Sequence, residues 1–421
     1  MKISDPVNEN YAATVVMVRR IVPLANCDNV VGAPFFGYQS IVGKDTQTGE
    51  LGILFPPEVQ LSDDMCYHNN LYRHTDKNVD QEAKAGYIED NRRVKAIRFR
   101  GHQSDALFMP LSSVAWTGVN PNDLKEGDTF DHLNGKEICR KYVAYRQRTQ
   151  GQGNAKNSKP VFDRVEARHF PEASHTSHYL PNVHRIDPKA TLIVTQKLHG
   201  TNVRIANTYV RRKLSLVERV ARKLGARVSE FEMDHVYGSH HVVKDRNNPY
   251  HNHWYGEDLW TWHGERIKDY IPEGYIVYGE IVGWTKSGGQ IQKGYTYDLP
   301  VGHSELYVYR VAHVNSRGLL VDLSWDQVWE FCADRALRTV PEIGRWTHGE
   351  FSVESLLDKR FADTMSHCVP VEAGKVDEGV CIRVDGMNPK IYKAKSPKFL
   401  VHESKMLDEG AVDLDLEEAE V

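Results

Sequence analysis

The sequence predicts an α+β fold with two domains, a small N-terminal β-barrel followed by a larger domain that mixes strands with helices. Three observations support this prediction. The 421 residues exceed the size at which a single hydrophobic core usually stops growing. The first 140 residues contain short β-rich runs separated by turn residues. The second half contains both strand and helix patterns.

The N-terminal strands are predicted from short runs of β-branched and aromatic residues bounded by Gly, Asn and Asp. Two such runs are residues 14–18 and 53–55. A third run, residues 94–101, alternates so that Ile97 and Phe99 lie on one face and two arginines on the other. Several short strands without a long helix indicate a small barrel.

A polar, basic stretch separates the two halves. It extends from Arg140 to about Ser158, contains few core-forming residues, and is predicted to be part of a linker at residues 141–185. Its basic residues, interleaved with Tyr142 and Tyr145, suit an RNA backbone, but a solvated linker is an equal alternative.

Two helices are predicted in the second half. The first runs from Leu214 to Leu224, with an apolar stripe on one face and Gly225 as its stop. Its basic residues lie away from that stripe. A solvated face is the favoured interpretation of these residues, and a contact with RNA is the alternative. The second helix begins at Ser324, which forms a capping box with Gln327.

The composition indicates a globular protein that stays inside the cell. Hydrophobic residues make up 40% and charged residues 26% of the chain, and no apolar run reaches the roughly 18 residues of a spanning helix. The N-terminus lacks the pattern of a signal peptide, so a cytoplasmic location is expected. Six scattered cysteines without a CxxC pair favour reduced thiols. The net charge of -4 includes an acidic tail at residues 407–421 and does not exclude a local basic surface for nucleic acid.

The most informative feature is a series of short motifs in a fixed order. Residues 197–202 read Lys-Leu-His-Gly-Thr-Asn, a Tyr-Gly-Glu segment ends at Glu280, Glu-Gly-Val-Cys-Ile-Arg begins at Glu378, and Lys-Ala-Lys ends at Lys395. Each motif alone is weak, because an isolated Lys is usually a surface residue and an isolated Glu usually belongs to a salt bridge. The order and spacing of all four argue against coincidence.

These residue types suit the transfer of a nucleotide to a lysine. Residues 193–195 predict a strand that presents Lys197 at its end, where Gly200 leaves room for a nucleotide to approach the backbone. A lysine attacks phosphorus only as the neutral amine, so its pKa must be lowered by burial or by neighbouring positive charge. Lys393, Lys395 and a bound metal ion supply such charge and balance the triphosphate.

Carboxylates and aromatic residues complete the predicted site. Glu280, at a strand end, is suited to accept from a ribose hydroxyl, and Glu378 to hold a hydrated Mg²⁺ ion. Tyr307 and Tyr309 alternate along a predicted strand and therefore face the same side. On that side, either one of the two rings stacks on the base of the nucleotide or both rings belong to the core of the sheet.

The motif series resembles that of the nucleotidyltransferases shared by polynucleotide ligases and RNA capping enzymes, and residues 197–202 are similar to the RNA ligase 2-like branch. The resemblance covers about residues 192–406. The β-rich region before it, with residues 97–104, looks like the OB-fold module that RNA ligase 5-type enzymes place before the transferase domain. The resemblance thus implies an OB-like β-barrel followed by an antiparallel-sheet nucleotidyltransferase domain of the ATP-grasp-like ligase type. The implied domains are residues 1–140 (OB-like, RNA-engaging), 141–185 (basic linker), 186–406 (adenylyltransferase) and 407–421 (acidic tail).

The resemblance also implies a role for each matching residue. Lys197 is the catalytic nucleophile that accepts AMP, Glu280 contacts the ribose, and Tyr309 stacks on adenine. Glu378, together with Glu280, is associated with the metal. The implied nucleotide-binding residues are Gln196, Leu198, Asn202, Glu280, Tyr309, Lys393 and Lys395.

Two positions depart from the pattern of the resembled branch. Gln196 stands where a Glu is common, and an arginine expected near His240 for a phosphate contact is missing. His240, Arg204 or another residue is left to make that contact. Histidines also crowd between His235 and His263, but they lack ligand-like spacing with Cys, so surface or RNA-contacting histidines are favoured over a zinc site.

The resemblance therefore predicts an ATP-dependent RNA ligase that uses ATP and Mg²⁺ or Mn²⁺, with RNA at a nick or at broken strand ends as its partner. It predicts a monomer without membrane attachment. Two alternatives stay open: a GTP-dependent capping guanylyltransferase, which usually carries an OB domain after the last lysine motif, and a catalytically silent RNA-binding protein.

Overall fold

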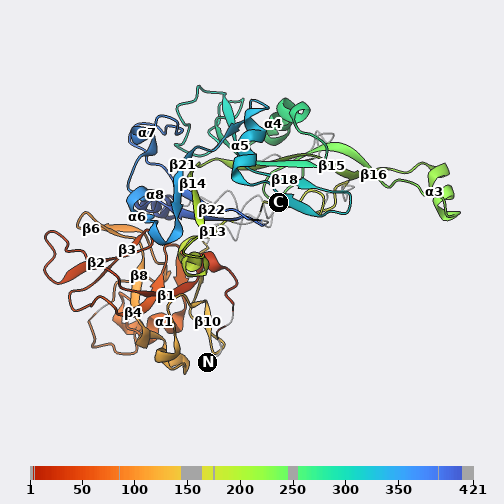
Figure 1. The fold of residues 1–421 in the computed structure, drawn as a ribbon. Helices are drawn as coiled ribbons and strands as arrows, with labels where there is room; N and C mark the ends of the chain where they lie inside the picture. The colour runs from red at the N-terminus through yellow and green to blue at the C-terminus, as the bar shows by residue number, and fades with distance from the viewer. Residues whose placement is uncertain are drawn as a thin grey trace.

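The computed structural model describes residues 3, 5–84, 86–143, 164–173, 176–244, 255–386 and 388–409. About half of the expected linker (residues 144–163 and 174–175) and all but the start of the acidic tail therefore lie outside the described residues. Within them the chain has a mixed α+β fold built on antiparallel sheets, as predicted. Figure 1 shows the β-rich N-terminal half below the C-terminal half, which extends to one side as a long arm.

The N-terminal half is built from short strands and one short α-helix. Its largest sheet is four-stranded in the order β8-β4-β1-β9, and the other strands form two-stranded ribbons. The sheet comprises β1 (Ala13–Met17), β4 (Leu51–Phe55), β8 (Leu107–Pro110) and β9 (Thr129–Phe130). The ribbons pair β2 (Val30–Phe35) with β3 (Tyr38–Gly43), β5 (Val59–Leu61) with β12 (Cys139–Lys141), β6 (Ile97–Phe99) with β7 (His102–Ser104), and β10 (His132–Leu133) with β11 (Lys136–Glu137). Helices here are α1 (Asp63–His68) and the 3-10 helices η1 (Glu9–Tyr11), η2 (Thr75–Lys77), η3 (Leu111–Thr117) and η4 (Pro121–Asp123).

Two sequence predictions need correction in this half. Among the described residues the pairings form an open sheet and separate ribbons, with no closed barrel. The predicted strand at residues 94–101 is shorter, because the chain turns at Arg100 and Gly101, whose φ angles are 48° and 87°. Ile97 and Phe99 are 48% and 37% exposed, so their shared face is not a core face. A two-stranded ribbon has no second layer to cover it.

The C-terminal half contains two mainly antiparallel sheets side by side, the first with β13 added in parallel to β23. One has the order β13-β23-β22-β14-β21, and the other has the order β16-β15-β17-β18-β19 with β20 added in parallel to β18. The first comprises β13 (Ser177–His178), β14 (Thr191–Lys197), β21 (Glu342–Thr347), β22 (Gly379–Val384) and β23 (Lys390–Lys395). The second comprises β15 (Thr201–Arg211), β16 (Phe231–Gly238), β17 (Tyr275–Gly283), β18 (Ser304–Val314), β19 (Leu320–Asp322) and β20 (Arg338–Thr339).

Helices cover these sheets and close the core between them. The predicted capping box of Ser324 and Gln327 begins α5 (Trp325–Ala333). Other helices are α3 (Leu216–Lys223), α4 (Leu259–Ile267), α6 (Glu354–Leu357), α7 (Phe361–Thr364), α8 (Pro397–Asp408) and the 3-10 helices η5 (Leu180–Arg185), η6 (Lys268–Tyr270) and η7 (His348–Glu350). No described helix is long and apolar enough to cross a membrane.

Helix α3 lies at the tip of the arm formed by β15 and β16 (Figure 1). Ser215 caps it through a capping box with Glu218, and Gly225 follows it with a φ of 88°, as the predicted stop requires. None of its residues is buried, and Val217 and Leu224 are 78% and 82% exposed. The apolar stripe that predicted the helix therefore packs against no core in this chain.

The two halves are joined through α8. Leu400 packs into a cluster with Val16 and Ala33 of the N-terminal half. The guanidinium of Arg93, which has no exposed side-chain surface, donates from Nη1 to Asp408 at 2.7 Å and from Nη2 to the carbonyl of Ser404 at 3.1 Å. These contacts place the N-terminal half against the end of the sheet that carries the motif lysines.

Candidate active site

A cavity of about 320 Å³ lies between the two C-terminal sheets and the N-terminal half. This volume is in the range of small-molecule sites. Residues from β14, β15, β17, β18, β22 and β23 line it, and all nine of the predicted site residues are among them. They are Gln196, Lys197, Leu198, Asn202, Glu280, Tyr309, Glu378, Lys393 and Lys395.

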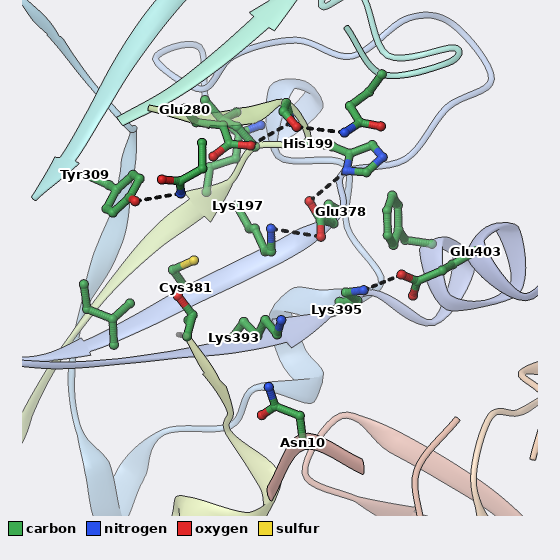
Figure 2. A pocket seen from close by; sticks show the side chains of 18 of the residues that line it. Asn10, Lys197, His199, Glu280, Tyr309, Glu378, Cys381, Lys393, Lys395 and Glu403 are labelled. Atoms are coloured by element: carbon green, nitrogen blue, oxygen red, sulfur yellow. Dashed lines mark hydrogen bonds and ion pairs between the residues drawn. The ribbon is translucent and has the colours of Figure 1, made fainter. Parts of the chain in front are cut away.

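Lys197 ends β14 and points into this cavity (Figure 2). Its Nζ lies 3.0 Å from Oε1 of Glu378. Burial alone would lower the pKa of Lys197, but the Glu378 carboxylate, aided by Glu280, raises it above its ordinary value. The sequence had instead predicted a lowered pKa for Lys197. The difference arises because a carboxylate, and not a cation, is the nearest charged group to the amine.

Glu378 is buried just before β22, with 3% of its side chain exposed. Its Oε2 lies 3.5 Å from Nδ1 of His199 and accepts no hydrogen bond from the described residues. Burial alone would raise the pKa of Glu378, but Lys197, with His199 and Lys395, lowers it, so the carboxylate stays ionised. An ionised carboxylate with an underused oxygen fits the oxygen ligand that Mg²⁺ or Mn²⁺ prefers.

Glu280 lies on β17 directly opposite Asn202 of β15. Its Oε1 accepts a hydrogen bond from the backbone nitrogen of Gly200 at 2.9 Å, and Nε2 of Gln292 donates to the Gly200 carbonyl at 2.8 Å. A Cβ at residue 200 would come within 2.2 Å of the carbonyl oxygen of Ile281. Glycine is therefore required here by the neighbouring strand, and the turn after Lys197 is fixed from both sides.

Tyr309 and Asn202 form the far wall of the cavity. The Tyr309 hydroxyl accepts from Nδ2 of Asn202 at 2.7 Å, while Oδ1 of Asn202 is buried and accepts no hydrogen bond from the described residues. A β-bulge in the β17–β18 pairing, where Gly279 is opposite Val308, separates Tyr309 from Tyr307. Tyr309 lines the cavity, whereas Tyr307 is 6% exposed within the main core. The wall thus offers an aromatic face and an unused acceptor.

Lys393 and Lys395 alternate on β23 and lie on the floor of the cavity (Figure 2). Nζ of Lys395 lies 2.6 Å from Oε1 of Glu403 on α8. Burial alone would lower the pKa of Lys395, but Glu403 and Glu378 raise it well above its ordinary value. Burial, together with Lys393 and Lys395, lowers the pKa of His178 well below its ordinary value, so it stays neutral beside them. The floor is cationic.

Gln196 and Leu198 flank Lys197, but their side chains contact other parts of the protein. Nε2 of Gln196 donates to the Val369 carbonyl at 2.8 Å and to Oδ1 of Asp377 at 2.5 Å, and its Oε1 accepts from the Val369 nitrogen at 2.9 Å. Both amide hydrogens of Gln196 are therefore committed to protein acceptors. Leu198 is 3% exposed within the core of the domain.

Several residues in or beside the cavity were not predicted from the sequence. Asn10, Tyr11 and Lys141 of the N-terminal half line it, with Nζ of Lys141 4.9 Å from the centre of the Tyr11 ring. The described residues of the expected linker include the end of β12, all of β13 and all of η5. Tyr297, whose hydroxyl accepts from the backbone nitrogen of His199 at 2.5 Å, was also missed. The basic stretch containing Lys141 was the available signal, but nothing in the sequence placed it beside Lys197.

The predicted histidine cluster divides in the structure. His240 lines the cavity, whereas His263 is a buried residue of α4 whose Nε2 lies 2.9 Å from Oγ of Ser304. His251 and His253 lie outside the described residues. Arg204, a candidate for the phosphate contact, is buried and donates to the backbone carbonyls of Phe170, Ser239 and His241. Its side chain thus supports the segment that carries His240.

Comparisons with known proteins agree with this geometry. The RNA ligase family model matches residues 190–395, which include every residue of the motif series. No curated protein matches the sequence.

Solved structures of an RNA ligase from Naegleria gruberi share the fold. The ligase with PPi matches with a TM-score of 0.54 and 15% identity over 95% of this chain and 100% of that one. Two variants of the same ligase, each with ATP and Mn, match with TM-scores of 0.54 and 0.55 and identities of 16% and 15%. These matches cover 93% and 94% of this chain, and 98% and 99% of theirs. The chain thus shares the fold of an RNA ligase, and its residues 190–395 match the RNA ligase family.

Proposed function

We propose that the chain is an ATP-dependent RNA ligase in which Lys197 takes AMP from ATP and passes it to an RNA end. The observation that carries this proposal is the position of Lys197. It lies in a cavity with two carboxylates on one side and two lysines on the other, inside the segment that matches the RNA ligase family. The solved ligase structures with ATP and Mn support the choice of nucleotide and metal.

The first step forms a lysyl-AMP intermediate. Nζ of Lys197, as the neutral amine, attacks the α-phosphorus of ATP, a nitrogen–phosphorus bond forms, and the bond to the pyrophosphate oxygen breaks. Glu378 and Glu280 would hold a divalent cation, Mg²⁺ or Mn²⁺, which would supply positive charge to the phosphates and would offset the carboxylate that raises the pKa of Lys197. Lys393 and Lys395 balance the charge that builds up on the departing pyrophosphate.

The remaining steps use the same cavity. The RNA 5′-phosphate attacks the phosphorus of lysyl-AMP and releases the amine of Lys197. The RNA 3′-hydroxyl then attacks the 5′-phosphorus, loses its proton, and expels AMP to seal the strand. Tyr309 stacks on adenine, Oδ1 of Asn202 accepts a hydrogen bond from the nucleotide, and Glu280 contacts the ribose.

The N-terminal half has a separate role in this proposal. Residues 1–140 form an OB-like domain that engages RNA, followed by the basic linker at 141–185, the adenylyltransferase domain at 186–406 and the acidic tail. Support comes from Asn10, Tyr11 and Lys141, which bring an amide, an aromatic ring and a cation to the cavity. Such groups suit a single-stranded nucleic-acid end. The protein acts as a monomer in the cytoplasm.

A sealing assay tests the proposal. Purified protein is mixed with Mg²⁺ and 5′-phosphorylated RNA, either nicked in a duplex or open, and with ATP or GTP. Joined RNA is expected with ATP. The variant Lys197→Ala abolishes joining, whereas Lys189→Ala, an exposed lysine just before β14, is the matched control and joins normally. Transfer from GTP to an RNA end indicates a capping enzyme instead, and RNA binding without reaction indicates a silent RNA-binding protein.

A further inference from the structure

Glu172, His240 and His241 form a cluster at the rim of the cavity, outside the motif series. One potential ligand atom from each side chain lies within 4.8 Å of the other two. Nδ1 of His241 and Oε2 of Glu172 are 3.0 Å apart, and the two imidazole rings lie 4.2 Å apart at an angle of 69°. The three side chains therefore converge on one point, although 68 residues separate Glu172 from His240.

The backbone that carries these side chains is held firmly. The guanidinium of Arg204, 2% exposed, donates to the carbonyl of Phe170 at 2.5 Å, to that of Ser239 at 2.9 Å and to that of His241 at 3.3 Å. One buried side chain thus ties the segment that precedes Glu172 to the turn that presents both histidines. The turn is closed by the Ser239 nitrogen donating to the Val242 carbonyl at 2.9 Å.

The hydrogen-bond donors of Arg204 are used by the backbone, and its charge lies within reach of the Glu172 carboxylate. Burial lowers the pKa of Arg204, and Glu172 partly offsets this lowering. The donors of Arg204 face three backbone carbonyls, and its guanidinium lies 4.5 Å from the centre of the Phe170 ring. The cluster itself contains two imidazoles and one carboxylate. Two histidines and a glutamate are the ligand set of open zinc sites, which bind the ion at about 2.0–2.2 Å and leave a fourth tetrahedral position.

We propose that Glu172, His240 and His241 bind a zinc-class divalent cation, separate from the Mg²⁺ or Mn²⁺ held at Glu378. A tetrahedral ion with such bonds keeps its ligands roughly 3.4 Å apart, so binding draws the three side chains slightly closer. His240 also lines the cavity, which directs the fourth position toward it. Resting on the proposed function, a phosphate oxygen of the RNA end fills that position, where the sequence analysis expected an arginine.

Metal titration tests the ion site without relying on ligase activity. The full chain is stripped with a chelator and titrated with Zn²⁺ in the presence of excess Mg²⁺, which saturates the carboxylates of the nucleotide cavity. The wild type is expected to bind one Zn²⁺ ion more than either variant, His240→Ala or Glu172→Gln, or to bind that ion with at least about tenfold higher affinity. His303→Asn, an exposed histidine in another turn, is the matched control. Equal zinc binding by all four proteins overturns the site.

Two further measurements keep the result interpretable. Thermal unfolding of the zinc-free proteins shows whether a variant is folded, and the Co²⁺ complex of the wild type should show the visible bands of tetrahedral nitrogen and oxygen coordination. RNA affinity is then compared with and without Zn²⁺. A fall in affinity on zinc removal, with AMP labelling of Lys197 unchanged, supports the phosphate contact, and an unchanged affinity overturns it. Loss of AMP labelling in the wild type would count against the proposed function and not against zinc binding.

Discussion

Arg93 is expected to be the most sensitive contact between the two halves. Its Nε and Nη2 donate to both oxygens of Glu58 at 2.5 and 2.7 Å, and Nη1 donates to Asp408 on α8. The Arg93 and Glu58 side chains are 0% and 9% exposed, whereas that of Asp408 is 45% exposed. Removing one partner of a buried pair leaves the other as an uncompensated buried charge.

The expected loss of unfolding free energy follows from this burial. Arg93→Ala should cost about 3–5 kcal/mol, because Glu58 is left without its cation. Asp408→Asn should cost less than about 1 kcal/mol, because its partner Arg93 keeps Glu58 and because Asp408 is solvated. At about 2–4 °C per kcal/mol for a cooperative unit of 150–250 residues, Arg93→Ala should lower Tm by roughly 6–20 °C.

Differential scanning calorimetry of the wild type and both variants measures these shifts. Asp408→Asn serves as the matched control because it alters the exposed end of the same network. A Tm loss for Arg93→Ala no larger than that for Asp408→Asn would refute the reasoning, since burial would then not determine the cost.

Three further predictions concern titration and the arm. Burial raises the pKa of Asp105 to about 7 from its ordinary 3.8, so the folded chain holds this proton more tightly and stability falls as pH rises from about 4 to 7. Asp105→Asn should flatten that fall in thermal unfolding between pH 4 and 8, by up to about 4 kcal/mol, and an unchanged slope would contradict the assignment. Glu378→Gln should lower the pKa of Lys197, so that the Lys197 amine reacts faster with a lysine-modifying reagent at pH 8. Peptide mass spectrometry measures the rate of this modification. An unchanged rate would show that Glu378 does not keep the Lys197 amine protonated. Replacing α3 by a short Gly-Ser turn should change unfolding free energy by less than about 0.5 kcal/mol in calorimetry, because α3 buries nothing, and a larger loss would reveal a packing role.

The sequence predicted much of the frame around Lys197. The β-branched run before the lysine indicated β14, and Ser324 with Gln327 indicated the start of α5, because strand propensity and helix capping are local effects. The order of the motifs placed Lys197 and Glu378 in one predicted site, and both line the same cavity although they are 181 positions apart in the sequence.

What the sequence could not predict depends on contacts between distant segments. The Lys197–Glu378 ion pair reverses the expected direction of the lysine pKa, and no spacing rule gives a distance of 3.0 Å between those atoms. The bulge opposite Gly279 separates Tyr307 from Tyr309, whereas simple alternation put them on one side. The apolar stripe of α3 correctly predicted a helix, but periodicity does not reveal whether a face is covered.

The most direct test of the central claim is the mass of the protein after incubation with ATP and Mg²⁺. The wild type and Lys189→Ala should each gain one AMP, and digestion should map it to the peptide containing Lys197, while Lys197→Ala should gain none. An AMP adduct on another residue, an adduct that persists in Lys197→Ala, or a nucleotide adduct formed from GTP and not from ATP would contradict the account.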